Sequence, residues 1–246
     1  ATRAALSVPL AERLLMIQQA LKALRHHPLR REDTRLELNI PSYELRVFEG
    51  GEIIARHRVI VGSNRRDFDP TSRQTGYLNR TPTTVTAVEA LIVNPFWRVP
   101  ERIKMFELDP RAERDAALYD SFDTIVEADG SERLVQRPGP NNALGQVQFI
   151  LSGHDALSLH DTPGKALFNE RYRALTHGSV RVDHAVEFAK TLLRIDGQPE
   201  VADTIESLQD SQNRTELSLN AHIPLQIYYS VVDVDEAGAV RYHPDV

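Results

Sequence analysis

The hydrophobic pattern changes its period near residue 35, and this change sets what the chain can fold into. Before it, apolar residues recur every three or four positions from residue 9 to about residue 26, which predicts one amphipathic helix. From Arg35 onward, apolar and polar residues alternate in short runs, as they do in half-buried strands. We therefore divide the chain into a helical linker segment, 1–34, and a mainly-β domain, 35–246.

Turn residues separate the alternating runs and mark the predicted strands. A hairpin is predicted at Glu49-Gly50-Gly51-Glu52, because two glycines between alternating runs allow a tight reversal. Asp183 is predicted to cap a helix that carries Leu192 and Leu193 on its apolar face, and a second short helix is predicted over 201–208. The predicted fold is mainly β with short helices. The predicted strands cover residues 36–40, 43–47, 53–61, 84–93, 146–151, 156–160, 217–219, 223–234 and 240–242.

The stretch between Pro100 and Gly145 has no clear period. It is rich in charged residues, contains Pro138-Gly139-Pro140, and predicts only one short helix over about 111–118. A long insertion of this kind inside a compact domain is more often a functional lid than a neutral loop. We therefore predict a lid at about 101–145.

Composition excludes several classes of function. The formal net charge of -6 argues against a dedicated nucleic-acid binder, which needs a basic field around its site. No apolar run approaches the roughly 20 residues of a membrane-spanning helix. The chain has no cysteine and its histidines lack zinc-like spacing, so we predict no disulfide, no metal and no cofactor. It opens at Ala1 without a secretory signal, which we interpret as a mature or trimmed piece.

One stretch carries the residues of a reaction site. His160 ends an apolar strand, and fifteen residues separate it from Thr176-His177-Gly178-Ser179-Val180-Arg181. Gly178 allows a tight turn before the serine, where successive backbone N–H groups can hold an oxyanion. His160 is placed as a base for Ser179, and Arg181 as a cation for a substrate carboxylate. Nucleophile, base and anion anchor are the parts of acyl transfer.

The same residues also have a structural interpretation. A lone His-Gly-Ser is frequent by chance, and a histidine at a strand end is more often a satisfied structural residue than a base. The spacing alone therefore indicates a reaction site without naming the reaction.

These residues resemble the signature of the L,D-transpeptidase (YkuD-like) catalytic domain, which is a histidine, a spacer, Ser or Thr, and then His-Gly-Cys. His160, Thr176, His177 and Gly178 match this signature, and Ser179 stands where the family has its nucleophilic cysteine. The resemblance extends over roughly residues 6–246 and is towards the larger YcbB-type branch. Further motifs carry it: Asn39-Ile40-Pro41, Thr81-Pro82-Thr83, Asn94-Pro95-Phe96-Trp97-Arg98-Val99-Pro100, Arg137-Pro138-Gly139-Pro140-Asn141-Asn142-Ala143-Leu144-Gly145, His160-Asp161-Thr162-Pro163, and the tail from Ile223-Pro224 to the turn at 235–238.

The resemblance implies a β-sandwich-like catalytic domain and a periplasmic enzyme of the cell wall. Such enzymes attack a peptidoglycan tetrapeptide stem between its diamino acid and its terminal D-Ala. D-Ala leaves, and an amine of a second stem takes the acyl group, which forms a 3→3 cross-link. The implied partners are donor and acceptor stem peptides and carbapenem-type inhibitors, with any membrane anchor only in the full-length parent.

The resemblance also implies roles for the residues of the signature. Ser179 takes the position of the nucleophile and His160 that of the general base. His177 and Gly178 shape the pocket, and backbone N–H groups around Gly178 and Ser179 would hold the oxyanion.

Substrate contacts are implied on both sides of the pocket. Thr176 and Arg181 are candidate contacts beside the nucleophile. Arg137, in the Pro/Gly-rich loop of the lid, is a further candidate, with a loop-fixing ion pair as the alternative. Tyr119 and Phe122, also in the lid, are either substrate contacts or core residues.

Serine at the nucleophile position changes the expected chemistry. A cysteine thiol has a pKa of about 8.5, and a neighbouring imidazole can draw it to the thiolate, whereas a serine hydroxyl must lose its proton during attack. Serine enzymes orient their histidine with a buried acid. Asp161 follows His160 directly, so on a strand it points to the opposite face and is a poor candidate for that acid. We expect this chain to bind substrate and to turn over slowly or not at all.

The origin and the consequence of Ser179 each have two explanations. The serine is either an engineered replacement of cysteine or the natural residue. Besides a weakened transpeptidase, the chain fits a catalytically inactive peptidoglycan-binding pseudoenzyme. It also fits an L,D-carboxypeptidase, in which water resolves the acyl-enzyme.

Overall fold

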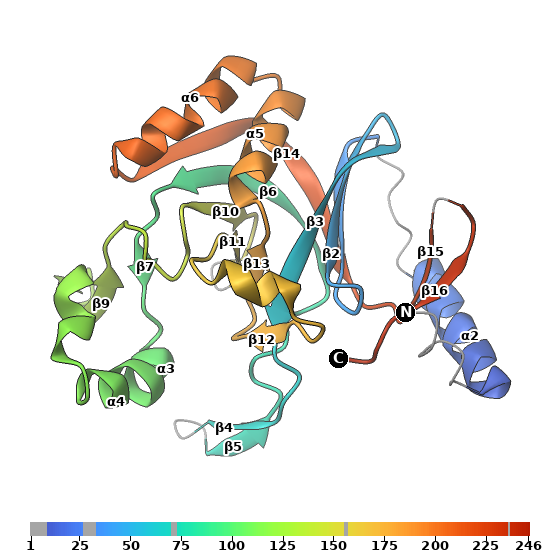
Figure 1. Ribbon diagram of the computed structural model, residues 1–246, viewed down its shortest axis with the longest axis horizontal. Helices are drawn as coiled ribbons and strands as arrows, with labels where there is room; N and C mark the ends of the chain where they lie inside the picture. The colour runs from blue at the N-terminus through green and yellow to red at the C-terminus, as the bar shows by residue number, and fades with distance from the viewer. Residues whose placement is uncertain (1–8, 27–32, 70–72, 155–156, 236) are drawn as a thin grey trace.

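A computed structural model describes residues 9–26, 33–69, 73–154, 157–235 and 237–246. In this part of the chain, most of the regular structure is β-strand, and the helices are short, as predicted (Figure 1). No helix among these residues is both long and apolar enough to cross a membrane.

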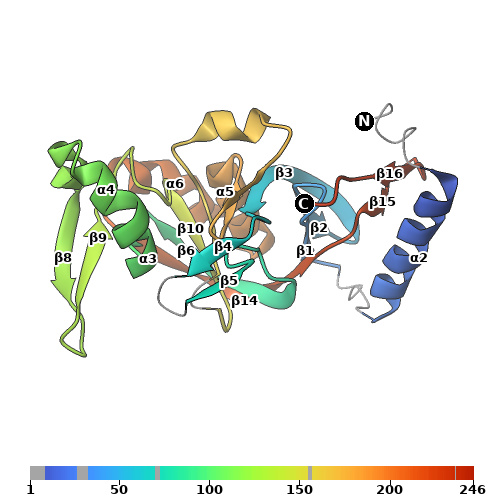
Figure 2. The ribbon, with the colours of Figure 1, turned by 90° about the horizontal axis from the view of Figure 1, so that it is seen from below.

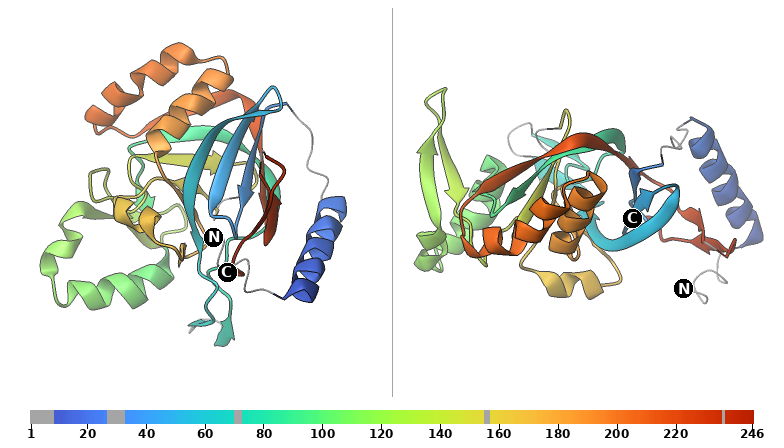
Figure 3. Two further views of the ribbon diagram at one scale, coloured as in Figure 1. Left: turned by 45° about the vertical axis from the view of Figure 1, so that its right-hand side comes forward. Right: turned by 90° about the horizontal axis from the view of Figure 1, so that it is seen from above.

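The main sheet closes on itself. Its order is β12 (Ala174–Thr176), β3 (Glu52–Gly62), β13 (Val180–Val182), β11 (Leu159–His160), β10 (Val147–Leu151), β6 (Thr84–Val93), β14 (Thr215–Tyr228), β1 (Arg35–Asn39) and β2 (Glu44–Glu49). The long strand β3 joins the two ends, because its first part pairs with β2 while Val59 and Ile60 pair with β13. The sheet therefore curves around one core, as a sandwich-like fold requires (Figure 3).

Helix α5 (Ala185–Ile195) completes this core from one end. Its buried residues recur every three or four positions, as the sequence predicts for an apolar helix face. The Phe188 ring lies 4.7 Å from that of Phe149 on β10 and 5.0 Å from that of His57 on β3, measured between ring centroids. Burying such a ring contributes roughly 1.5–3 kcal/mol to folding. Helix α6 (Pro199–Asp210) lies beside α5 in Figure 1 and covers the predicted segment 201–208.

Two sequence predictions at element ends are wrong. Asp183 does not cap α5: its carboxylate binds the Arg58 guanidinium at 2.7 Å, and His184, at a positive φ of 52°, precedes the helix instead. The predicted strand 223–234 is two elements, since β14 ends at Tyr228 and β15 (Val232–Val234) turns away to pair with β16 (Val240–Tyr242). The predicted strand 156–160 lies partly outside the described residues, and β11 is its described part.

The predicted N-terminal helix is α2 (Leu10–His26), and it packs beside the β15–β16 hairpin (Figure 2). Its apolar stripe stays largely outside this contact, because Leu10, Leu14 and Leu21 are 72%, 53% and 49% exposed. Its role as a linker stays a prediction.

The region predicted as a lid has more structure than the sequence indicates. Three short helical segments follow one another: α3 (Glu101–Ile103), the π-helix η1 (Lys104–Leu108) and α4 (Asp109–Ala112). A 3-10 helix, η2 (Ala116–Ser121), and a small sheet of β7 (Trp97–Arg98), β9 (Glu132–Gln136) and β8 (Phe122–Val126) complete it. The single helix predicted over about 111–118 is therefore wrong. Strand β8 has no buried residue, so it lacks the apolar alternation by which strands are predicted.

A second projection leaves the sheet after β3. It carries a two-stranded hairpin, β4 (Asp67–Asp69) and β5 (Gln74–Gly76), which the sequence did not predict because its residues are mostly polar. The hairpin extends away from the sheet next to the lid (Figures 1 and 3).

Candidate active site

Two neighbouring strands bring the predicted catalytic residues to one face of the sheet. β11 and β13 run parallel, with Leu159 opposite Val180 and His160 opposite Arg181. Leu159 and Val180 are buried in the core, so His160 and Arg181 point to the other face. Ser179 directly precedes β13, two positions before Arg181, so the alternation of the strand, continued by one residue, predicts that Ser179 lies on the same face.

His160 has the protonation state of a base. Its side chain is 5% exposed, and its Nδ1 lies 2.5 Å from the backbone oxygen of Asp161. Burial, together with the positive charge of Arg181, lowers the pKa of His160 to about 4. The imidazole is therefore neutral at neutral pH. Its Nδ1–H donates to the Asp161 carbonyl, and Nε2 keeps the lone pair that can accept a proton.

Two threonine hydroxyls fix the loop that carries Ser179. Thr176 Oγ1 accepts from the Gly178 N–H at 3.2 Å and donates to the Ser179 carbonyl. Thr81 Oγ1 donates to the Gly178 carbonyl at 2.7 Å and accepts from the Gly62 N–H at 2.8 Å. Gly178 has a φ of 118°, which favours glycine over residues with a side chain. The turn before Ser179 is thus held on both sides.

The hydrogen bonds of this turn bear on the expected oxyanion hole, which stays a prediction. The Gly178 N–H donates to Thr176 Oγ1. The Ser179 N–H makes no hydrogen bond with any described residue. Of the two expected donors, Ser179 is therefore the one whose N–H the turn leaves available.

Arg181 is a cation without a counter-ion. Within the described ranges its guanidinium forms no ion pair or hydrogen bond, and its Nε is buried without a partner. Burial lowers its pKa, because the charged form loses hydration. A half-buried guanidinium in this state binds a carboxylate favourably, since the ligand restores the lost interactions.

The lid contacts the nucleophile loop directly. His177 Nε2 lies 2.7 Å from a carboxylate oxygen of Glu107 on η1. Arg102, at the start of the lid, pairs with Asp67 on β4 and donates to Asn79 at 3.1 Å. The lid is therefore tied both to the loop of Ser179 and to the β4–β5 hairpin.

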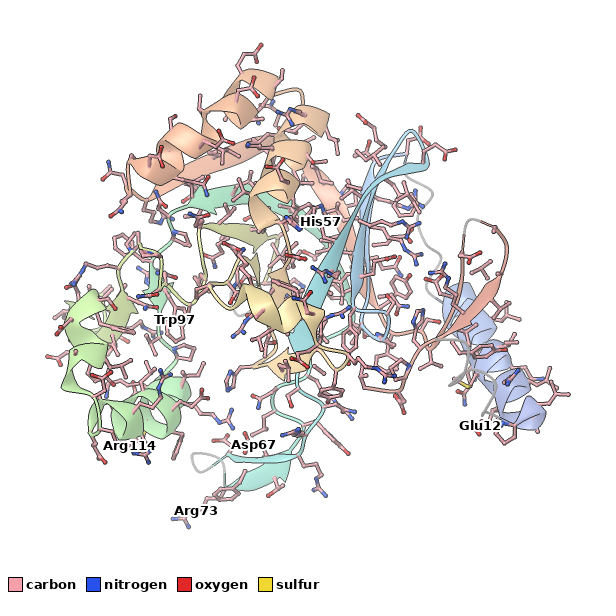
Figure 4. All side chains as sticks on the ribbon, viewed as in Figure 1. Glu12, His57, Asp67, Arg73, Trp97 and Arg114 are labelled. Atoms are coloured by element: carbon pink, nitrogen blue, oxygen red, sulfur yellow. The ribbon has the colours of Figure 1, made fainter. Side chains whose placement is uncertain are left out.

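The remaining lid candidates have structural partners. Arg137 pairs with Asp123 and donates to two backbone carbonyls of the same region, which is the loop-fixing alternative; substrate contact by Arg137 stays a prediction. Phe122 packs edge-on against Tyr119 and Trp97, with ring centroids 5.4 and 6.4 Å away. Trp97 lies on the lid side of the molecule in Figure 4. Tyr119 and Phe122 are thus half-buried and pack on each other within the lid, and a substrate contact by either stays a prediction.

The sequence missed two residues that support the site. Thr81 was noted only as part of a motif, although its hydroxyl joins two turns that are far apart in the chain. Asp161 is buried, and its carboxylate accepts from the Gln146 N–H at 3.0 Å and pairs with Lys165. Gly145 leaves no space for a Cβ, which would lie 2.5 Å from the Asp161 carboxylate. Asp161 thus fixes the end of the lid with its side chain, while its carbonyl orients His160.

Among the described residues, no three His, Asp or Glu side chains are grouped as metal ligands would be.

Comparisons with known proteins point to one protein family. The pattern of the L,D-transpeptidase catalytic domain (YkuD) matches residues 33–205. A Haemophilus influenzae protein named as a candidate L,D-transpeptidase is 29% identical over an alignment of 227 residues, which covers 85% of this chain and 43% of that protein. The chain thus spans less than half of this relative's length.

Solved structures with detectable similarity are more distant. The catalytic domain of Enterococcus faecium L,D-transpeptidase acylated by ertapenem is 12% identical, with a TM-score of 0.32 over 80% of this chain and 98% of that chain. Mycobacterium tuberculosis L,D-transpeptidase 1 is 9% identical, with a TM-score of 0.33 over 80% of this chain and 61% of that chain.

Proposed function

Because this chain belongs to the family of L,D-transpeptidase catalytic domains, we propose that its site is built to form 3→3 cross-links between peptidoglycan stem peptides, in a form that Ser179 weakens. The observation that carries the proposal is the pairing of His160 with Arg181 on one face of the sheet, with Ser179 directly before β13. We further propose that the chain belongs to the YcbB-type branch, on the motifs quoted above. Its substrate would place its action in the periplasm.

The proposed reaction has two halves. In the first, the Ser179 Oγ attacks the carbonyl that joins the diamino acid to D-Ala, and His160 Nε2 takes the hydroxyl proton. The carbonyl oxygen becomes an oxyanion that the Ser179 N–H stabilises. The amide bond then breaks, His160 returns the proton to the leaving amine of D-Ala, and an ester joins the stem to Ser179. In the second half, an acceptor amine attacks this ester, His160 moves its proton to Oγ, and the cross-link leaves.

Arg181 would supply substrate recognition in this scheme. Its uncompensated guanidinium suits a free carboxylate of the donor stem, and its place opposite His160 would hold that stem beside the base. His177 would join the loop of Ser179 to the lid through its contact with Glu107.

Two features of the site make serine a poor nucleophile here. His160, with a pKa of about 4, is a weak base for a hydroxyl proton. Its Nδ1 is oriented by a backbone carbonyl, whereas serine enzymes use a carboxylate that stabilises the imidazolium. A thiol at this position would need far less help, because it loses its proton several pKa units more readily.

Product analysis tests the proposal. We expect the Ser179→Cys form to convert a disaccharide-tetrapeptide into cross-linked dimers with release of D-Ala, and the Ser179 form to do so at least about a hundredfold more slowly. Trimmed tripeptides in place of dimers would instead show the L,D-carboxypeptidase reaction. Absence of both products from the cysteine form would contradict acyl transfer at this site.

The same observations favour one second candidate, a non-catalytic peptidoglycan-binding protein. Serine together with a carbonyl-oriented histidine preserves the pocket while removing the chemistry. This candidate predicts that stem peptides bind to both forms and that the change to cysteine produces no turnover. Calorimetric titration with a tetrapeptide stem, run beside the product analysis, separates it from the enzyme.

A further inference from the structure

The loop that carries the β4–β5 hairpin is anchored on the loop of Ser179. We call the described residues 63–69 and 73–80 the arm. At its start, the Ser63 N–H donates to the Thr176 carbonyl at 2.9 Å, and just after its end the Thr81 hydroxyl donates to the Gly178 carbonyl at 2.7 Å. Both ends of the arm are thus bonded to the turn before Ser179. The hairpin itself extends away from the sheet and lies below β12, which ends at Thr176 (Figures 1 and 4).

The arm is basic in an acidic protein. It contains four arginines and two aspartates, whereas the whole chain has a net charge of -6. The arginines are all exposed, and in the described part of the chain none of them pairs with a carboxylate; they are Arg65, Arg66, Arg73 and Arg80. Asp67 is neutralised by Arg102 of the lid. Arg66 and Arg80 hydrogen-bond neutral groups of the arm, so no described carboxylate neutralises the positive charge that the arm presents.

The arm also presents apolar surface. Phe68, Tyr77 and Leu78 are 53%, 48% and 40% exposed. The Arg80 guanidinium stacks over the Tyr77 ring, 3.5 Å from its centroid, which holds both groups in a fixed, flat arrangement. Exposed aromatic rings beside unpaired guanidinium groups suit a ligand that combines flat apolar faces with negative charge.

We propose that the arm binds the peptidoglycan strand outside the catalytic pocket. Sugar rings would pack on Phe68 and Tyr77, and the carboxylates of stem peptides would pair with the arginines. This inference rests on the proposed function and names the polymer contact of the same site: the arm holds an extended strand so that one of its stems reaches Ser179. A nucleic acid is less favoured, because the acidic remainder of the chain repels it.

Sedimentation with purified, insoluble peptidoglycan sacculi tests the arm in the full chain. We expect Arg65→Gln with Arg66→Gln to weaken binding about tenfold, and Tyr77→Ser to weaken it severalfold. The matched control is Arg111→Gln with Arg114→Gln, which removes two exposed arginines from the lid and should leave binding unchanged. Circular dichroism of each variant verifies that it is folded.

A second readout separates the arm from the chemistry. In the Ser179→Cys background, we expect the arm variants to be acylated by a carbapenem, a small molecule, at the rate of their parent. If sacculus binding depends on the arm but acylation does not occur, the result would support binding by the arm and contradict the proposed enzymatic activity. Equal binding by the arm variant and its parent would overturn the inference. Equal weakening by the control, or arm-dependent binding of single-stranded DNA or of a second copy in its place, would overturn it as well.

Discussion

Thr81 provides a direct test of how the nucleophile loop is held. Its hydroxyl is buried between the Gly178 carbonyl and the Gly62 N–H, at 2.7 and 2.8 Å. Thr81→Val keeps the shape of the side chain and leaves both backbone groups unpaired. Because a buried unpaired group costs about 1–3 kcal/mol and the bond to the Gly178 carbonyl is only partly buried, we expect the free energy of unfolding to fall by about 2–4 kcal/mol. A domain of ordinary stability survives this loss.

Thr81→Val should also lower the acylation rate of protein that remains folded. A turn displaced by about 1 Å can cost on the order of a hundredfold in rate, so carbapenem acylation of the Ser179→Cys form should fall by tenfold to roughly a hundredfold at a temperature where the variant is folded. Thr81→Ser keeps the hydroxyl and should restore the rate. Thr83→Val, a change at an exposed neighbour, is the matched control and should alter the free energy of unfolding by less than about 0.5 kcal/mol. An unchanged acylation rate in Thr81→Val would refute the reasoning.

Three further predictions concern pH, packing and the lid. The pKa of His160 is about 4 in the folded chain and 6.5 in the free side chain, so the unfolded chain binds the proton more readily. The free energy of unfolding should therefore fall by up to about 3 kcal/mol as the pH is lowered from 6.5 to 4. His160→Gln should reduce this pH dependence, measured by urea titrations. Phe188→Ala should cost about 3–5 kcal/mol in the same titrations, whereas exposed Phe68→Ala should cost under about 0.5 kcal/mol; similar costs would refute the assigned core. Glu107→Gln weakens an exposed pair with His177, so it should change stability by less than about 1 kcal/mol yet raise hydrogen exchange over 101–112; unchanged exchange would show that this pair does not hold the lid.

The parts of the fold that the sequence predicts are those with one buried face. Alternation predicts the core strands because one side of each packs inward, and the apolar face of α5 predicts that helix for the same reason. Strand β8 and the β4–β5 hairpin escape prediction because they have little buried apolar surface. Asp183 fails as a cap because Arg58, far away in the chain, engages its carboxylate.

The sequence likewise predicts only part of the candidate site. Residue types and spacing name His160, Ser179 and Arg181, but only the parallel register of β11 and β13 sets His160 beside Arg181. The register depends on long-range pairing, which no local pattern records. The support from Thr81 likewise comes from a residue far away in the chain. The bond from the Gly178 N–H to Thr176 is local, between residues two positions apart, and it leaves the Ser179 N–H as the available donor.

The central claim is that the pocket is a competent acyl-transfer site in which Ser179 limits the chemistry. Intact mass spectrometry of the Ser179 form and the Ser179→Cys form after incubation with a carbapenem tests it most directly. We expect only the cysteine form to gain the mass of one drug molecule, with the adduct on residue 179. Absence of label from both forms, or an adduct at another residue, would contradict it.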